Sequence, residues 1–294
     1  MTAASVPAGR SLFRAAELIG DILSRPSGAI GLTLVALHLL IALAAPLIVP
    51  YDYKAISSLL MLKPPSTAHW LGTDHIGRDV LTRTLLGGRE ALLVTTIATP
   101  IAVLWGGFLG ILFGLSGGWL DDMAMRLVDA VLSLPKILFV LTAAAVLGAE
   151  PIVLVPMLAF FYGVPVIRVA RAATHDVVAR DFVTASRARG HSRFDIIMRE
   201  ILPNVRDVLL VEGAMRWSWM LLTFSSLSFL GFGVSPPTPD WGLMIKDASP
   251  VMSFAWWAVL APIAALSTLI VGINLSADAL AKALGIDRAQ KAPV

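Results

Sequence analysis

The sequence predicts an all-α membrane protein with six transmembrane helices. Of its 294 residues, 57% are hydrophobic and only 15% are charged. The mean hydropathy of +0.79 lies above the range of water-soluble domains. Six apolar runs approach or exceed about 18 residues, the length that a helix needs to cross roughly 30 Å of hydrocarbon. These three observations place the chain in a bilayer.

The apolar runs and the charges within them define the six predicted spans. Pro135 is expected to kink the third run, which also contains Lys136, and the fifth run contains Glu212 and Arg216. The predicted spans are Ala29–Val49, Ala91–Ser116, Leu127–Leu147, Ile152–Ala170, Val208–Leu230 and Met252–Ser276. An even number of spans puts both termini on one side of the membrane.

Lysine and arginine predict the orientation of these spans, because basic loops resist translocation. With the N-terminus inside, fifteen basic residues lie on the inner face and six on the outer face. The inner set includes Arg10, Arg14, Arg288 and Lys291. We therefore expect a multi-pass protein of the cytoplasmic membrane with both termini in the cytoplasm. The first apolar run is too long for a signal-peptide core, so we expect it to be a retained span.

The spans divide the chain into three parts and three prominent loops. The parts are a cytoplasmic N-terminal segment (1–28), a six-span domain (29–281) and a cytoplasmic tail (282–294). Within the six-span domain, residues 50–90 and 232–251 are predicted to be external. Residues 172–206 form an internal loop that is too polar to enter lipid and too long for a tight turn.

The internal loop predicts a short, exposed, basic helix. Asp181 is expected to cap a helix over Phe182–Arg189, because its carboxylate accepts backbone N–H groups. Gly190 is expected to end this helix in a left-handed conformation. A second amphipathic helix is predicted over Phe194–Ile201, until Pro203 breaks the pattern. An arginine-rich, solvated helix that serves topology alone is the alternative.

Several charges fall inside or beside the predicted spans, where an unpaired charge is costly. Glu212 and Arg216 are four residues apart and share a helical face, so they can form an ion pair. Arg126 and Asp129 are three apart and can do the same. Lys136 has no such neighbour. One interpretation is that four of these residues line a translocation pathway, namely Lys136, Asp129, Glu212 and Arg216. The alternative is that the charges form ion pairs that hold helices together, and that the Lys136 side chain extends to the membrane interface.

Four glycines recur every four residues in and after the second span. Gly106, Gly110, Gly114 and Gly118 would lie along one helix face, where a neighbouring backbone can approach closely. This spacing predicts a seam between helices. Glycines scattered through a lipid-facing helix are the alternative, because glycine is common in membrane helices.

No enzyme motif is found in the sequence. It contains no HExxH zinc motif, no GxSxG nucleophile elbow and no cysteine. No two of its five histidines have the i, i+4 spacing of a helical metal pair. It also lacks the P-loop pattern GxxxxGK[ST], so ATP hydrolysis would need a partner. A membrane transport subunit is therefore expected, with no catalytic and no metal-binding residues; a self-sufficient secondary transporter or channel is the alternative.

Four stretches resemble the permeases of ABC importers. The spacing of Thr184-Ala185-Ser186, Gly190 and Leu202-Pro203 is similar to the cytoplasmic loop in which Glu-Ala-Ala, Gly and Leu-Pro recur in that family. Three further stretches resemble segments of the dipeptide, oligopeptide and nickel permeases, namely His69–Glu90, Gly114–Pro135 and Ser226–Ile245. The resemblance fits the second permease subunit of this family and implies the six-helix fold of type I ABC importer permeases.

The resemblance also implies roles for the internal loop. In the family this loop forms a coupling helix that docks on an ATP-binding subunit. The residues that would carry the coupling are Asp181, Thr184, Ala185, Ser186, Arg187, Arg189, Gly190 and Pro203. The sequence departs from the family pattern at Thr184, at Ser186, and at Glu200, where an aliphatic residue is common.

The partners implied by the resemblance are proteins of a bacterial inner-membrane importer. They are a homologous but different second permease subunit, two ATP-binding subunits, and a periplasmic or lipid-anchored substrate-binding protein. ATP and Mg²⁺ would bind in the ATP-binding subunits, with no cofactor in this chain and no nucleic acid. Substrate would cross by alternating access, and peptides are the default among the substrates of the family.

Overall fold

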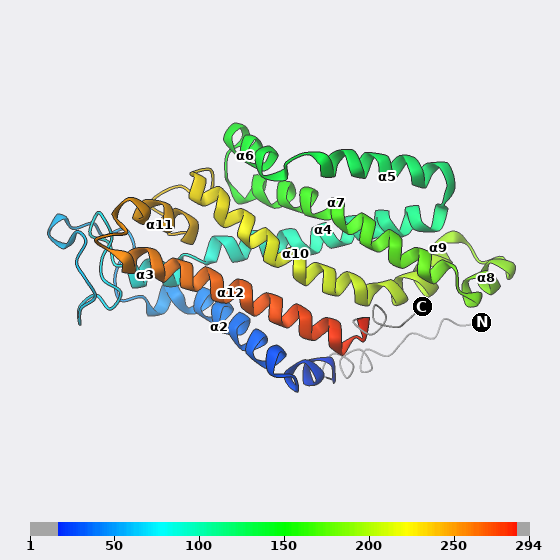
Figure 1. The fold of residues 1–294 in the computed structure, drawn as a ribbon, viewed down its shortest axis with the longest axis horizontal. Coiled ribbons are helices and arrows are strands. Elements are labelled where there is room, and N and C mark those ends of the chain that lie inside the picture. The colour runs from blue at the N-terminus through cyan, green and yellow to red at the C-terminus, as the bar shows by residue number, and fades with distance from the viewer. Residues whose placement is uncertain (1–16, 287–294) are drawn as a thin grey trace.

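The computed structural model describes residues 17–286 as an elongated bundle of helices (Figure 1). Within this part of the chain the assigned elements are all helical. Arg10, Arg14, Arg288 and Lys291, which contribute to the predicted orientation, lie outside the described residues, as do most of the N-terminal segment and much of the tail.

Five long helices run along the bundle. Helix α2 packs against α12, α4 packs against α7, and α10 contacts α4, α7 and α12 (Figure 1). The contact between α4 and α7 is the most extensive in the bundle. The bounds are α2 (Pro26–Ile48), α4 (Arg89–Ser116), α7 (Pro151–Val178), α10 (Leu202–Leu230) and α12 (Trp256–Ala283). Helix α10 is thus the element that connects the two packed pairs.

The third predicted span is not one helix. It is divided into α5 (Gly118–Ser133) and α6 (Lys136–Leu147), which are bent by 75° relative to each other. Leu134 has an extended backbone with ψ 133°, because the ring of Pro135 disfavours helical geometry in the residue before it. The predicted kink at Pro135 is therefore confirmed, and it divides the third predicted span into two helices.

Four helical segments are long and apolar enough to cross a membrane, and a fifth is added if α5 and α6 count as one bent span. Helix α10 has 29 residues but is not among them. Its Glu212, Arg216 and several serines lower its hydropathy, although its length is sufficient. The described residues thus contain four to five apolar candidate spans.

The two predicted external segments fold together at one end of the bundle. This end holds α3 (Val80–Leu86) and α11 (Trp241–Ala248), with the long connection after α2 (Figure 1). The buried guanidinium of Arg83 donates hydrogen bonds from Nη1 to the carbonyl oxygens of Tyr53 and Pro237, both at 3.1 Å. One arginine therefore ties the segment before α4 to the loop after α10.

The opposite end carries the internal loop. It contains α8 (Asp181–Ala188) and α9 (Arg193–Ile196), which continues through a π-helical turn (Ile197–Ile201) into α10. The prediction that Pro203 breaks the helix is wrong. The N–H of Leu202 bonds to the carbonyl of Ile197, five residues back, so the widened π turn leads into α10 with Pro203 in its first turn, where the missing N–H is tolerated.

Candidate functional site

Three of the four glycines lie where α4 crosses α7. An ideal Cβ on Gly106 would lie 2.3 Å from the carbonyl oxygen of Gly163, and one on Gly110 would lie 2.5 Å from that of Ile167. At Gly114, a Cβ would meet the side chain of Thr174 at 2.8 Å. Such distances leave no room for a side chain, so the two backbones are in direct contact along this seam.

Gly118 does not extend the seam. Helix α4 ends at Ser116, and Gly117 follows with a φ of +59°. Gly118 then opens α5 with a φ of +66°, and a Cβ built on it meets no atom within 4 Å. The four-residue spacing continues in the sequence to Gly118, but α4 has already ended at Ser116. Gly118 therefore does not lie on the glycine face of α4, and the prediction for Gly118 is wrong.

Helix α8 occupies the position predicted for the coupling helix, shifted by one residue. Arg180 is the N-cap and makes no side-chain capping bond, while Asp181 is the first helical residue rather than the cap. A carboxylate in this first turn still interacts favourably with the helix dipole. Gly190 has a φ of +80°, and the N–H of His191 bonds to the carbonyl oxygen of Ser186 at 3.3 Å, which closes the helix in a left-handed turn.

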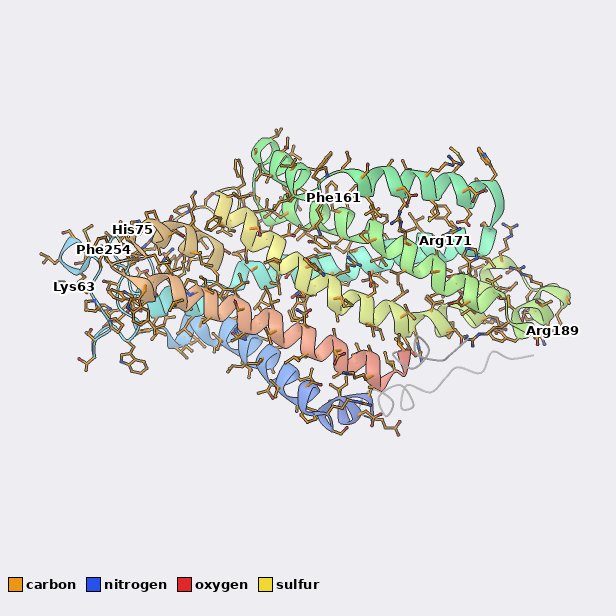
Figure 2. All side chains as sticks on the ribbon, in the orientation of Figure 1. Lys63, His75, Phe161, Arg171, Arg189 and Phe254 are labelled. Atoms are coloured by element: carbon orange, nitrogen blue, oxygen red, sulfur yellow. The ribbon has the colours of Figure 1, made fainter. Side chains whose placement is uncertain are left out.

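One face of α8 is buried against α9 and the π-helical turn. Val183 and Ser186 are fully buried, and Val183 belongs to an apolar cluster with Ile196, Ile197 and Ile201. The other face is open, with exposed side chains at Asp181, Thr184, Ala185, Arg187 and Arg189. Figure 2 shows Arg189 at the tip of the molecule, beyond the ends of the long helices. The helix is thus fixed on one side and accessible on the other.

A polar clamp joins α8 to the π-helical turn. The hydroxyl of Ser186 donates to Oε1 of Glu200 at 2.9 Å, and Nη2 of Arg189 donates to the same hydroxyl at 3.0 Å. Glu200 was not among the site residues expected from the sequence. One feature of the sequence could have indicated the role of Glu200. Glu200 and Ser186 both depart from the family pattern, and the structure shows that they are hydrogen-bond partners.

The predicted intramembrane charges are mostly paired. Nε of Arg216 donates to Oε1 of Glu212 at 2.6 Å, as expected from their spacing. Asp129 instead forms an ion pair with Arg168 of α7, not with Arg126. This ion pair holds α5 against α7, which favours a structural reading of Asp129.

A second ion pair between α5 and α7 was not expected. The buried carboxylate of Asp121 accepts from Nη2 of Arg171 at 2.6 Å, and Nε2 of His175 lies 3.6 Å from it. Figure 2 shows Arg171 on α7, below α5. The two residues are 50 positions apart, so no local spacing rule in the sequence could have joined them.

Lys136 is held by aromatic rings. Its Nζ lies 4.5 Å from the ring centroid of Tyr162 on α7 and 5.5 Å from that of Trp219 on α10. Among the described residues, no carboxylate forms an ion pair with it. Cation–π contact stabilises the ammonium group without neutralising its charge.

Asp240 is a buried acid at the end of the bundle that holds α3 and α11. It caps α11 by accepting a hydrogen bond from the N–H of Leu243 at 3.0 Å. Removal from water raises the pKa of Asp240 to about 6, because burial disfavours the charged carboxylate. At the end of the bundle that carries α8, the hydroxyl of Ser192 lowers the pKa of Asp195 by hydrogen bonding to its ionised form.

No group of three or more His, Asp or Glu side chains suited to a metal ion occurs among residues 17–286. The features that the structure brings together are a packed membrane bundle, an exposed helix fixed to its end, and a few buried charges.

Comparison with known proteins identifies the family of this chain. Residues 106–286 match the family described as binding-protein-dependent transport system inner membrane component. The di/tripeptide transport system permease protein DppC of Pseudomonas aeruginosa is 36% identical over 86% of this chain and 86% of its own length. The dipeptide transport system permease protein DppC of Alkalihalophilus pseudofirmus is 33% identical over 87% and 84%. The oligopeptide transport system permease protein OppC of Mycobacterium bovis is 34% identical over 83% and 84%.

These matches favour a permease over the alternative of a self-sufficient channel or secondary transporter, and a permease of this kind is not a catalytic subunit. The matched region begins at the glycine seam and includes α8, the clamp and the whole of α10. The chain belongs to the family of inner-membrane permease components of binding-protein-dependent transport systems.

Proposed function

We propose that this chain forms half of the transmembrane pathway of an ATP-driven importer for peptides or peptide-like solutes. The relatives named for di/tripeptide, dipeptide and oligopeptide transport support this substrate class. The second half is a homologous but different permease subunit. ATP and Mg²⁺ bind in two separate ATP-binding subunits, and a periplasmic or lipid-anchored binding protein delivers the substrate to the external end.

The observation that carries this proposal is the attachment of α8 to α9 and the π-helical turn, which continue into α10. Helix α8 is short, exposed on one face and clamped on the other by Val183 and Ser186. Force applied to such a helix moves α10 with it as a rigid body. Closure of the ATP-binding subunits would thus tilt α10 and switch the pathway between inward-facing and outward-facing states.

Charge reversal on the exposed face of α8 tests the docking surface. Arg187→Glu with Arg189→Glu should reduce copurification of the ATP-binding subunits and abolish peptide uptake by proteoliposomes that contain the full complex. Lys282→Glu, at the end of α12, is the matched control and should leave both unchanged. Unaltered assembly and uptake in the double variant would refute the docking role of α8.

We further propose six spans, with α10 as the fifth, and both termini in the cytoplasm. The excess of basic residues on one side supports this orientation. Because the chain has no cysteine, single cysteines report cleanly on sidedness. His191→Cys before α10 should react only with membrane-permeant maleimide, and Ser235→Cys after α10 should also react with an impermeant one. Labelling of both positions from the same side would contradict the crossing of α10.

A further inference from the structure

Lys136 stands at the break between α5 and α6. It is the first residue of α6, directly after the 75° bend at Leu134 and Pro135. In Figure 1 this junction lies along the middle part of the bundle, away from the end with α3 and α11 and from the end with α8. Lys136 therefore lies inside the bent pair of helices that together meet the length and hydropathy of one membrane span, away from both ends of the pair.

The two rings that hold Lys136 differ in burial. Tyr162 is buried, and its hydroxyl lies 2.9 Å from the carbonyl oxygen of Trp219 and 2.5 Å from Oγ1 of Thr223. These bonds fix the ring over which the ammonium group lies. Trp219 is 50% exposed, and Lys136 itself is exposed. The ammonium group thus lies at the open surface of the bundle, on a rigid support.

Lys136, on α6, differs from the arginines of the neighbouring helices α7 and α10. Arg168, Arg171 and Arg216 each have a carboxylate partner within the chain. Lys136 has only π faces among the described residues. A charge inside a membrane span is costly without a counter-ion. We therefore expect the ammonium group of Lys136 to contact an anion at some stage of the transport cycle.

We propose that Lys136, supported by Tyr162 and Trp219, is a binding site for the carboxylate of the substrate during passage. The inference rests on the proposed importer function and adds a substrate requirement, a free carboxylate such as the C-terminus of a peptide. The ammonium group donates charge-assisted hydrogen bonds to the carboxylate, and the rings keep it in place when the site is empty.

The first test compares a dipeptide with its C-terminal amide in proteoliposomes that contain the full complex and its binding protein. Lys136→Met should lower dipeptide uptake by about tenfold, the effect of losing one charge-assisted hydrogen bond, and leave amide uptake unchanged. Lys136→Arg should retain most of the preference for the carboxylate. The wild-type and variant complexes use the same binding protein. Its own preference between the dipeptide and the amide therefore cancels when the uptake of each substrate by a variant is compared with that by the wild type.

Lys54→Met is the matched control. Lys54 lies on the external segment with its Nζ 5.4 Å from the ring centroid of Tyr53, so its loss removes a cation–π contact of the same kind outside the spans. This variant should keep the wild-type preference. A second outcome is that Lys136→Met lowers dipeptide and amide uptake equally and also reduces assembly of the complex. That result would show that Lys136 pairs with a carboxylate of the partner permease and not with the substrate, and it would overturn the proposal. Unchanged uptake of both would overturn it as well.

The second test does not depend on transport. Acylation of Lys136 by an amine-reactive reagent is followed by peptide mass spectrometry of the complex in nanodiscs, with and without the dipeptide or its amide. Protection of Lys136 by the dipeptide alone supports the site, even if no peptide uptake is found and the proposed importer function fails. Peptide uptake without protection and without carboxylate preference refutes the site and leaves the importer function intact.

Discussion

The clamp between Ser186 and Glu200 should set the local stability of α8. Replacement of Ser186 by alanine, the residue that the family pattern has there, removes the donor to Glu200 at 2.9 Å and the acceptor for Arg189 at 3.0 Å. A hydrogen bond to a charged group contributes about 1.5–3 kcal/mol. Glu200 is half-buried and Arg189 is exposed, so both regain water, and we expect a net cost of about 1–2 kcal/mol.

Hydrogen exchange of the α8 amides measures this cost, because these amides exchange through local opening of the loop. A loss of about 1–2 kcal/mol raises the opening constant by about 5- to 30-fold, and the exchange rate rises with it. The experiment uses the full complex in nanodiscs without nucleotide. Amides of α12 serve as an internal reference and should not change.

A double-mutant cycle isolates the contact. Glu200→Leu leaves the fully buried hydroxyl of Ser186 without its acceptor, so it should destabilise α8 as much as Ser186→Ala does. The combined variant restores the apolar pairing of the family pattern and should be more stable than the sum of the two losses predicts. Additive effects, with a coupling energy below about 0.3–0.5 kcal/mol, would refute the clamp.

Three further predictions concern packing, protonation and backbone conformation. Gly110→Ala places a Cβ 2.5 Å from the carbonyl oxygen of Ile167 and should destabilise the complex by about 1–3 kcal/mol in thermal unfolding, more than Gly107→Ala, which meets only a movable leucine side chain; equal effects would contradict the seam. The pKa of Asp240, raised to about 6, means that the folded state binds more protons than the unfolded state, so stability should fall as pH rises from about 4 to 6, and Asp240→Asn should remove this part of the dependence; an unchanged pH profile would argue against burial of the acid. A Cβ at Gly190 would meet no atom within 4 Å, but the residue has a φ of +80°, which costs an alanine about 1–2 kcal/mol. Gly190→Ala should therefore speed hydrogen exchange of the α8 amides, and an unchanged exchange rate would show that the left-handed turn is dispensable.

Local patterns predicted the elements whose causes are local. The apolar runs located the long helices, and the basic segment ending at Gly190 located α8 to within one residue. The i, i+4 spacing gave the pair of Glu212 with Arg216. In each case the responsible residues are neighbours on one helix, so the sequence alone contains the geometry.

The errors arose where the outcome depends on the surrounding structure. Two prolines with the same local chemistry behave differently: Pro135 breaks a helix, whereas Pro203 is accepted in the first turn after a π-helical segment. Asp129 has a potential partner three residues away but pairs with Arg168 on another helix. Neither result follows from spacing, because the first depends on the π-helical turn before Pro203 and the second on which helix packs alongside α5.

The continuous helical rod from Arg193 to Leu230 has a mechanical consequence. At 1.5 Å per residue, its 38 positions span about 57 Å, much more than the thickness of the hydrocarbon core. On a lever of this length, a tilt of only about 5° moves one end by roughly 5 Å relative to the other. In the proposed importer, the end that docks on the ATP-binding subunits and the opposite end of the bundle are thus joined by one rigid helix, so a small tilt imposed at the first end displaces the second by several ångströms.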